Sequence, residues 1–264
     1  MQQRSAASIV TFAAVLCLVC GLLVAASAVA LRPLQKENKI LDRQKKVLIV
    51  AGLMTNDDDK TPEEIKQLFN DNIEARVVDL KTGQYNDKID IKSFDQRKAA
   101  KEITMSRTVP TNKAGVLRVP NSAMVYIKRD GDKVDRLILP VEGKGLWSTL
   151  YGYIALANDA NTIKGLIFYE HMETPGLGGE IENPLWTRLW PGKKVFDTTA
   201  DGQPTATAKI EVVKGQAQPG NEYQVDGLSG ATITSRGVTY LVQFWLADQF
   251  APYLKAFRAK GERS

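Results

Sequence analysis

The hydrophobic positions divide the chain into an uncharged N-terminal run and a longer part in which apolar and polar residues are mixed. Residues 5–31 contain no Asp, Glu, Lys or Arg, and the run from Ile9 to Leu31 is almost wholly apolar. A run of this length can cross a bilayer as one helix. Between Leu31 and Met54, apolar residues recur at loosely helical spacing among charged ones, which predicts a connecting amphipathic helix.

Beyond that helix the pattern changes to alternation. Thr61-Pro62-Glu63-Glu64 is typical of a helix start, with a capping residue, a proline at the first position and early acids. Alternation over 123–128 and 134–141, on either side of a polar Asp-Gly turn, predicts a β-hairpin. Further strands are expected over 74–80, 150–157, 163–170 and 206–213. A helix, or a loop followed by a helix, is expected over 91–102, and further helices over 184–189 and from about Arg236 onward.

These elements predict an α+β fold, in which an N-terminal transmembrane helix precedes an antiparallel-sheet domain with flanking helices. We expect three segments. Residues 1–31 form the anchor, residues 32–121 a connecting helix and an N-terminal α/β segment, and residues 122–264 the main domain.

Composition and charge narrow the classes of function. The 264 residues are 44% hydrophobic and 25% charged, which is enough to bury a sizeable core. A formal charge of +5, without basic residues interleaved with aromatics, argues against nucleic acid as a partner. Both cysteines, Cys17 and Cys20, lie inside the apolar run. No further Cys or nearby His completes a ligand set, so we expect them to be small packing side chains.

The residues leave the topology of the anchor open. Ala26-Ser27-Ala28 or Ala28-Val29-Ala30 could serve as a signal-peptidase site, but the apolar run is longer than a usual signal peptide core, which favours an uncleaved anchor. Such an N-terminal segment places the bulk of the chain outside the cytoplasm. The positive-inside rule favours the opposite orientation, because six basic residues follow the run: Arg32, Lys36, Lys39, Arg43, Lys45 and Lys46.

The stretch from Asp226 to Ser235 is the strongest candidate binding site. It holds four hydroxyls and two glycines just before the helical C-terminal region. Ser and Thr oxygens here would cap the helix expected near Arg236. The unpaired N–H groups and the macrodipole of a helix start favour an anion such as phosphate. A capped helix without any ligand is the alternative interpretation.

Two other loops contain candidate residues. Trp147 lies beside glycines, where it could stack on an aromatic ligand or fill the core. The loop 171–180 is rich in Gly and Pro, which lets the backbone approach a ligand closely. Its His171 is the only histidine and is expected to be a structural hydrogen-bonding group. Glu170, Glu173 and Glu180 are expected to be solvated or bound to backbone, and no Ser/His/Asp or metal-ligand set is legible.

Three motifs in order carry a family resemblance. They are Gly-Lys-Gly-Leu-Trp-Ser at 143–148, Glu-His-Met-Glu-Thr-Pro-Gly-Leu-Gly-Gly at 170–179, and Asp-Gly-Leu-Ser-Gly-Ala-Thr at 226–232. Together they resemble the signatures of the C subunit of the sodium-translocating NADH:quinone reductase. The G subunit of the Rnf electron-transport complex shares parts of the last two motifs but is usually shorter before its FMN-binding domain. The long segment from Leu53 to Asn121 therefore favours the reductase family.

The resemblance implies that residues 122–264 are an FMN-binding domain and that Thr232 carries FMN through a phosphoester bond. It also implies candidate positions around the cofactor: Trp147, Gly176, Leu177 and Gly178 near the ring, Glu173 and Thr174 as polar contacts, and Ser229, Gly230, Ala231, Thr234 and Ser235 around the phosphate, with Gly145, Leu146 and His171 completing the set.

The resemblance further implies an electron-relay role, between an iron-sulfur centre and the flavin of a sister subunit, that helps to drive Na+ export. The implied partners are other membrane subunits, lipid of the bacterial inner membrane and a flavin transferase. The anchor would be single-pass and the domain periplasmic. Two further interpretations stay open, a membrane-anchored module that binds an anion without redox chemistry and a purely structural subunit.

Overall fold

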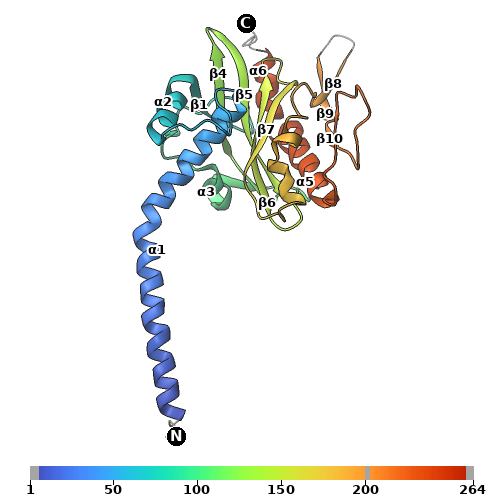
Figure 1. Cartoon of the computed structure of the whole chain (residues 1–264). Helices are drawn as coiled ribbons and strands as arrows, with labels where there is room; N and C mark the ends of the chain where they lie inside the picture. Colours follow the sequence, from blue (N-terminus) through green and yellow to red (C-terminus); the bar gives the residue numbers. More distant parts are fainter. Residues whose placement is uncertain (1–5, 200–202, 260–264) are drawn as a thin grey trace. The chain divides into compact units, whose positions relative to one another are not determined.

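In the computed structural model, residues 6–199 and 203–259 are described, and the chain forms two compact units, Met1–Arg43 and Gln44–Ser264 (Figure 1). The first five residues of the expected anchor lie outside the described part. An N-terminal apolar helix and an antiparallel-sheet domain with helices are both present, so the predicted fold class is confirmed.

The expected anchor and connecting helix form one helix, α1 (Ala6–Val50), of 45 residues with Pro33 inside it. Among the described residues it is the one helix long and apolar enough to cross a membrane. The large apolar side chains from Ile9 to Leu34 are exposed. A helix that leaves such a surface uncovered fits a lipid environment.

The helix α2 (Pro62–Asn72) begins as the sequence predicts. Thr61 accepts a hydrogen bond from the Glu64 N–H through its side chain (3.3 Å), and the Glu64 carboxylate accepts one from the Thr61 N–H (2.7 Å). This reciprocal pair is a capping box, which satisfies two donors at the helix start. The chain then enters β1 (Ile73–Asp79) directly.

The centre of the domain is a five-stranded sheet in the order β1-β4-β5-β6-β7, with every neighbouring pair antiparallel. The strands of the expected meander are β4 (Ser122–Asp130), β5 (Lys133–Lys144), β6 (Thr149–Ala157) and β7 (Ile163–Glu170). Asp130 pairs with Lys133 across the hairpin turn, where Gly131 takes a φ of 60°. That left-handed conformation favours glycine, so the Asp-Gly signal located the turn correctly.

One face of the sheet packs against the C-terminal helices. Buried residues of β5, such as Leu137, Leu139 and Val141, join one hydrophobic core with Leu241 and Trp245. The helical segments are α5 (Thr232–Gln243), the π-helical η3 (Phe244–Gln249) and α6 (Ala251–Ala259), and Figure 1 shows α5 and α6 beside the sheet. The Trp245 indole donates a hydrogen bond to the Glu142 carbonyl (2.7 Å), which fixes the helices to the strand that leads into the 145–148 loop.

The other face is covered by α2, α3 (Gln96–Lys101) and the last turns of α1. Phe69 of α2 meets Tyr126 edge to face at 6.0 Å, and the Arg97 guanidinium lies 3.6 Å from the ring centroid of Tyr151. Arg97 also donates two hydrogen bonds to Glu170 (2.7 and 2.9 Å). Both faces of the sheet therefore carry helices.

Apart from the C-terminal helix, two expected elements differ most in extent. Of the two forms expected over 91–102, the structure has a loop followed by a helix, α3. The Asp95 side chain accepts hydrogen bonds from the N–H groups of Arg97 and Lys98 and so starts the helix there. The strand expected over 206–213 is broken into β9 (Pro204–Ala208) and β10 (Glu211–Val212). The break arises because β9 pairs with β8 antiparallel while β10 pairs with β11 in parallel. The remaining short elements are η1 (Ile103–Met105), β2 (Ser106–Thr108), β3 (Arg118–Pro120), η2 (Gly178–Glu182), α4 (Pro184–Thr187), β8 (Phe196–Thr198) and β11 (Gln224–Val225).

Candidate functional site

The three segments that carry the sequence motifs meet at one end of the sheet. The loop 145–148 joins β5 to β6, the loop 171–177 follows β7, and the turn 226–231 precedes α5. The Ser148 hydroxyl accepts a hydrogen bond from the Met172 N–H (2.8 Å), and the Thr234 hydroxyl donates one to Glu173 (2.6 Å). The structure thus brings together residues that lie far apart in the sequence.

Glu173 is the centre of this assembly. Its side chain is buried, with only 5% of the residue exposed. One carboxylate oxygen accepts hydrogen bonds from the N–H groups of Trp147 (2.9 Å) and Ser148 (3.2 Å), and the other from the N–H of Leu146 (3.2 Å) and the hydroxyl of Thr234. Burial alone would raise the pKa of Glu173, but these hydrogen bonds favour the charged form and bring the pKa below its ordinary value.

Two glycines make room for that carboxylate. A Cβ atom on Gly145 would lie 2.6 Å from one Glu173 oxygen, and a Cβ atom on Gly178 would lie 2.8 Å from the other. Both distances are too short for any side chain. Gly178, expected near the cofactor ring, and Gly145, expected elsewhere around the cofactor, are thus also required by the packing around Glu173.

The helix α5 begins at Thr232, four residues before the expected start near Arg236. Its N-cap is Ala231, and no side chain caps it, so the prediction that the Ser/Thr cluster supplies capping oxygens is wrong. The hydroxyls are used elsewhere. Thr234 donates to Glu173, and Ser235 accepts a hydrogen bond from the Leu228 N–H (3.1 Å).

The first N–H groups of α5 consequently remain available. Gly230 takes a φ of 70°, and the Ala231 N–H donates to the Leu228 carbonyl (3.1 Å), which closes the turn just before the helix. Within residues 6–199 and 203–259, the N–H groups of Thr232, Ile233 and Thr234 have no acceptor. Unpaired donors at a helix start form a site that favours an anion.

The hydroxyl-bearing residues of the turn differ in accessibility. Thr234 is only 1% exposed and Ser235 is also buried. Ser229 is exposed, and Thr232 is half-buried at the first position of the helix. The Thr232 hydroxyl makes no hydrogen bond in the described part of the chain. An incoming group can therefore reach Ser229 and Thr232 but not the other two.

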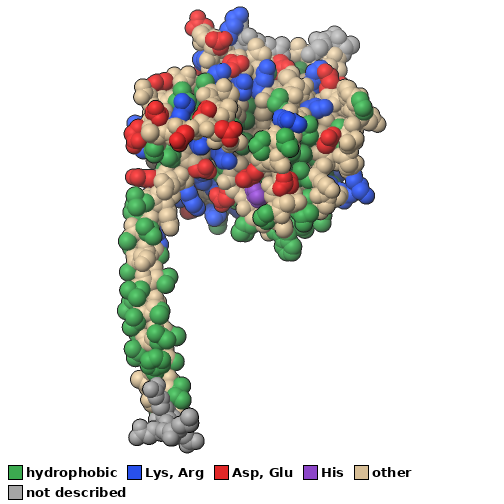
Figure 2. All heavy atoms as spheres, viewed as in Figure 1, with side chains coloured by type: hydrophobic (Ala, Val, Ile, Leu, Met, Phe, Trp, Pro, Cys, Tyr) green, Lys and Arg blue, Asp and Glu red, His purple; other side chains and the backbone are tan. Residues whose placement is uncertain are grey.

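Apolar side chains surround this turn without being covered. Trp147 is 68% exposed, so it does not belong to the core, and Leu146, Leu177 and Ile233 are exposed as well. Figure 2 shows hydrophobic side chains gathered on the face of the domain that carries its single histidine. Met172 and Ile233 were not selected from the sequence, although Met172, an apolar residue inside a polar loop, is a usable signal of such a surface.

His171 is a structural hydrogen-bonding residue. Its Nδ1 atom accepts a hydrogen bond from the Glu173 N–H (3.1 Å), and its Nε2 atom lies 3.2 Å from the Glu182 carboxylate. The exposed Thr174 contributes its carbonyl, which accepts from the N–H groups of Leu177 (3.1 Å) and Gly179 (2.9 Å). Gly176, between them, is exposed with a φ of 75°. Glu182 was not expected from the sequence, because nothing near it marks its contact with His171.

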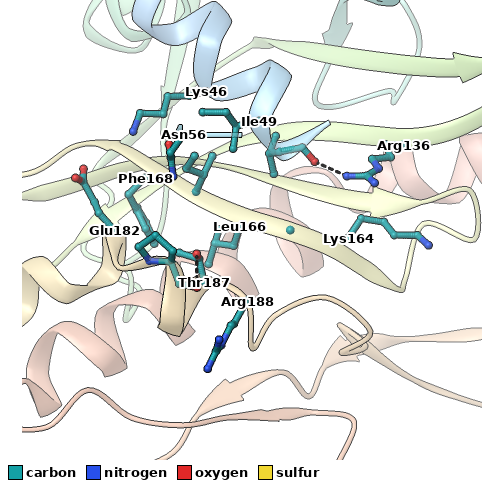
Figure 3. A pocket seen from close by; sticks show the side chains of 14 residues that line it. Lys46, Ile49, Asn56, Arg136, Lys164, Leu166, Phe168, Glu182, Thr187 and Arg188 are labelled. Carbon is teal, nitrogen blue, oxygen red and sulfur yellow. Dashed lines mark hydrogen bonds between the residues drawn. The ribbon is translucent and has the colours of Figure 1, made fainter. Parts of the chain in front are cut away.

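A cavity of about 190 Å³ lies apart from these loops, along β7 and between the last turns of α1 and α4 (Figure 3). Its rim carries the basic residues Lys46, Arg136, Lys164 and Arg188, and Arg136 donates a hydrogen bond to the Val50 carbonyl (2.9 Å). It contains none of the residues selected from the sequence as cofactor contacts. In the figure, Lys164 and Arg188 point away from its centre, so the positive charges do not converge.

Comparisons with known proteins agree with the motifs. Residues 145–247 match the FMN-binding domain family. A Pseudomonas aeruginosa protein, named as the C subunit of a Na(+)-translocating NADH-quinone reductase, is 44% identical over 98% of both chains. A Vibrio anguillarum protein of the same name is 45% identical over 93% of this chain and 92% of its own.

Solved structures agree as well. The crystal structure of Shewanella oneidensis NqrC matches with a TM-score of 0.74 at 33% identity, covering 85% of this chain and 99% of that one. The C subunit of the Na(+)-translocating NADH-quinone reductase from Parabacteroides distasonis matches with a TM-score of 0.64 at 29% identity, covering 85% and 96%. The resemblance inferred from the sequence is confirmed, and the chain belongs to the family formed by the C subunits of Na(+)-translocating NADH-quinone reductases, which are oxidoreductase complexes.

Proposed function

We propose that this chain is an electron-relay subunit that carries FMN covalently, through a phosphoester bond to Thr232. FMN supplies one-electron and two-electron redox chemistry when bound, and the chain supplies attachment, orientation and a shaped surface. A covalent tether suits a relay because it prevents the cofactor from dissociating between electron transfers.

The accessibility of the hydroxyls carries this proposal. Thr234 is buried and its hydroxyl is held by Glu173, whereas the Thr232 hydroxyl is half-buried and makes no hydrogen bond in the described part of the chain. Ser229 is accessible too, but it lies in the turn before α5 and outside the helix. Only Thr232 is both accessible and located at the helix start.

The start of α5 supports a phosphate at this position. The N–H groups of Thr232, Ile233 and Thr234 have no acceptor among the described residues, and the helix macrodipole adds partial positive charge there. A phosphate attached to the Thr232 side chain would be within the reach of these donors. Ser229, Gly230 and Ala231 form the backbone beside it, and Ala231 has no bulk to exclude it.

The exposed apolar side chains support a place for the flavin ring beside the same turn. Trp147, Leu146 and Leu177 offer flat or flexible apolar surface to an aromatic ring system, and Gly176 leaves the backbone open next to them. Burying such side chains against the ring would stabilise it on the domain.

In the complex we place the flavin between an iron-sulfur centre and the flavin of a sister subunit, with electron transfer coupled to Na+ export. We place the chain in the bacterial inner membrane, anchored once by α1, with the FMN-binding domain on the periplasmic side. Attachment would require a flavin transferase as an additional partner.

Peptide mass spectrometry of the full chain, coexpressed with a flavin transferase, tests the proposal. We expect one FMN phosphoryl adduct on Thr232, lost in Thr232→Ala and retained in the matched variant Ser229→Ala. An adduct on Ser229, or a flavin that leaves on denaturation, would contradict the assignment. The second outcome would favour the non-covalent anion-binding module, since only a covalent flavin remains fluorescent on a denaturing gel.

A further inference from the structure

We infer that Glu173 and Thr234 are positioning residues for flavin attachment, because they tie the 145–148 loop to the first turn of α5 and thereby fix where Thr232 presents its hydroxyl. This inference rests on the proposed attachment at Thr232. In this inference Glu173 acts on the flavin indirectly, by holding the residues around it. The sequence had led us to expect a direct contact between Glu173 and the cofactor.

The hydrogen bonds define the tie. Thr234 Oγ1 donates to Glu173 Oε2 at 2.6 Å, and that oxygen also accepts from the Leu146 N–H at 3.2 Å. Glu173 Oε1 accepts from the N–H groups of Trp147 and Ser148 at 2.9 and 3.2 Å. Four donors thus converge on one carboxylate. An ionised carboxylate accepts hydrogen bonds through both oxygens and donates none, so its chemistry matches this arrangement.

The carboxylate has no free side for a cofactor. It lies between the backbones of Gly145 and Gly178. A Cβ atom added at either glycine would lie within 2.8 Å of a carboxylate oxygen. Behind it, the His171 ring accepts a hydrogen bond from the Glu173 N–H. Any effect of Glu173 on the flavin must therefore be transmitted through the segments that it holds.

The geometry of the helix links Thr234 to Thr232. Successive residues of an α-helix are rotated by about 100° around the helix axis. Side chains two positions apart, such as those of Thr232 and Thr234, therefore point in nearly opposite directions. The Thr234 hydroxyl is held inward by Glu173 at 1% exposure of the residue. This bond fixes the rotation of the first turn of α5 and directs Thr232 outward.

Attachment is a group transfer that depends on this direction. Direct condensation of a hydroxyl with a phosphate releases water and is unfavourable in water, so the donor is a flavin nucleotide with an activated phosphate, such as the pyrophosphate of a flavin dinucleotide. The Thr232 Oγ1–P bond forms, the P–O bond to the departing nucleoside monophosphate breaks, and the hydroxyl proton passes to the transferase or to solvent. No electron is transferred. The rate depends on how well Oγ1 is held in line with the donor phosphorus.

Thr234 offers a matched pair of variants. Thr234→Val is nearly isosteric but lacks the hydroxyl, whereas Thr234→Ser keeps the hydroxyl and loses one methyl group. We expect Thr234→Val to lower the initial rate of flavin incorporation into the full chain by about tenfold or more, and Thr234→Ser to stay close to wild type. Glu173→Gln is expected to behave like Thr234→Val, because its amide group replaces one acceptor oxygen with a donor. Glu180→Gln, in the adjoining η2, is the control.

The readouts separate positioning from a general loss of structure. We expect Thr234→Val to lower the maximal rate with an unchanged KM for the flavin donor, with the adduct still on Thr232 and with unchanged circular dichroism. Wild-type incorporation in Thr234→Val, or equal impairment of Thr234→Ser and Thr234→Val, would overturn the inference. If the wild type carries no flavin on Thr232, the proposed function fails instead.

One measurement does not depend on any variant folding. The N–H groups of Trp147 and Ser148 lie in a surface loop but donate to a buried carboxylate. In wild-type protein we expect their hydrogen exchange to be about a hundredfold slower than in an unstructured peptide. Exchange at the unprotected rate would show that Glu173 does not hold the loop.

Discussion

Gly178 and Thr234 approach each other so closely that a Cβ atom on the glycine would lie 2.6 Å from the threonine Oγ1. The Thr234 hydroxyl cannot move away without breaking its hydrogen bond to Glu173. A glycine of η2 and a threonine of α5 therefore depend on each other, although they belong to 3₁₀-helical and α-helical segments that lie far apart in the chain.

We expect Gly178→Ala to destabilise the domain by about 1 to 3 kcal/mol, because the added methyl group would overpack a site that has no space for it. Denaturant unfolding of the full chain in detergent measures the change. Gly179→Ala is the matched control. An added Cβ atom there would lie no closer than 3.1 Å to another atom, the Thr174 carbonyl oxygen, so we expect a smaller loss of stability. Equal losses for the two variants would contradict this account.

The strands of the sheet could be predicted from the sequence because each depends on residues that are close together in the chain. Alternation in β4 and β5, together with the glycine at Gly131, determined both strands and the turn between them. The helix start at Thr61 was predictable for the same reason. The start of α5 was not, because Thr234 bonds to Glu173, 61 positions away, instead of capping its own helix. The local pattern was typical of helix capping, but the tertiary hydrogen bond to Glu173 uses the Thr234 hydroxyl instead.

The candidate site divides in the same way. Its three loops were marked by glycines and motif residues, and the structure brings them together. The roles within them depend on long-range contacts that no spacing encodes. The sequence left Trp147 equally open to stacking on an aromatic ligand and to filling the core. Only the fold shows that its backbone N–H is held while its side chain is exposed. The contact between His171 and Glu182 is likewise a product of the fold.

Glu142 gives a pH-dependent prediction. Burial raises the pKa of this carboxyl from 4.5 to about 7, although Arg97 and Lys101 nearby oppose the shift. The folded protein then holds a proton that the unfolded chain has released, so the free energy of unfolding falls as the pH rises from about 4.5 to about 7. We expect Glu142→Gln to remove this dependence and to be more stable than wild type by about 1 to 3 kcal/mol at about pH 8.

Urea unfolding of the wild type and Glu142→Gln, across about pH 5 to 8, measures the difference. The control is Glu211→Gln, an exposed carboxyl on β10. Parallel stability curves for the wild type and Glu142→Gln would mean that Glu142 titrates as it does in the unfolded chain.

The topology of the domain is open to a labelling test. With Cys17 and Cys20 replaced, the chain has no other cysteine. A single cysteine is then introduced at Gln84, an exposed residue whose carbonyl accepts a hydrogen bond from the Asp79 N–H. We expect a membrane-impermeant thiol reagent to block it in cells with a permeabilised outer membrane, because we place the domain in the periplasm. A second probe at Lys133, on the β4–β5 hairpin, provides the control. Labelling by permeant reagents alone at both positions would place the domain in the cytoplasm and agree with the positive-inside rule.

The last prediction concerns Trp147. Its backbone N–H donates a hydrogen bond to Glu173 (2.9 Å), while its side chain is 68% exposed. Truncating the side chain therefore leaves the loop anchored. We expect Trp147→Ala to shift the flavin absorbance or reduction potential, because the indole would stack on the ring, with FMN still attached to Thr232. The free energy of unfolding should change by less than about 0.5 kcal/mol without flavin. The spectrum and potential of Trp147→Phe should lie between those of the wild type and Trp147→Ala. Leu185 is an exposed apolar residue on α4, and Leu185→Ala should leave the spectrum unchanged. An unaltered spectrum and potential in Trp147→Ala would assign the exposed indole to a surface other than the flavin site.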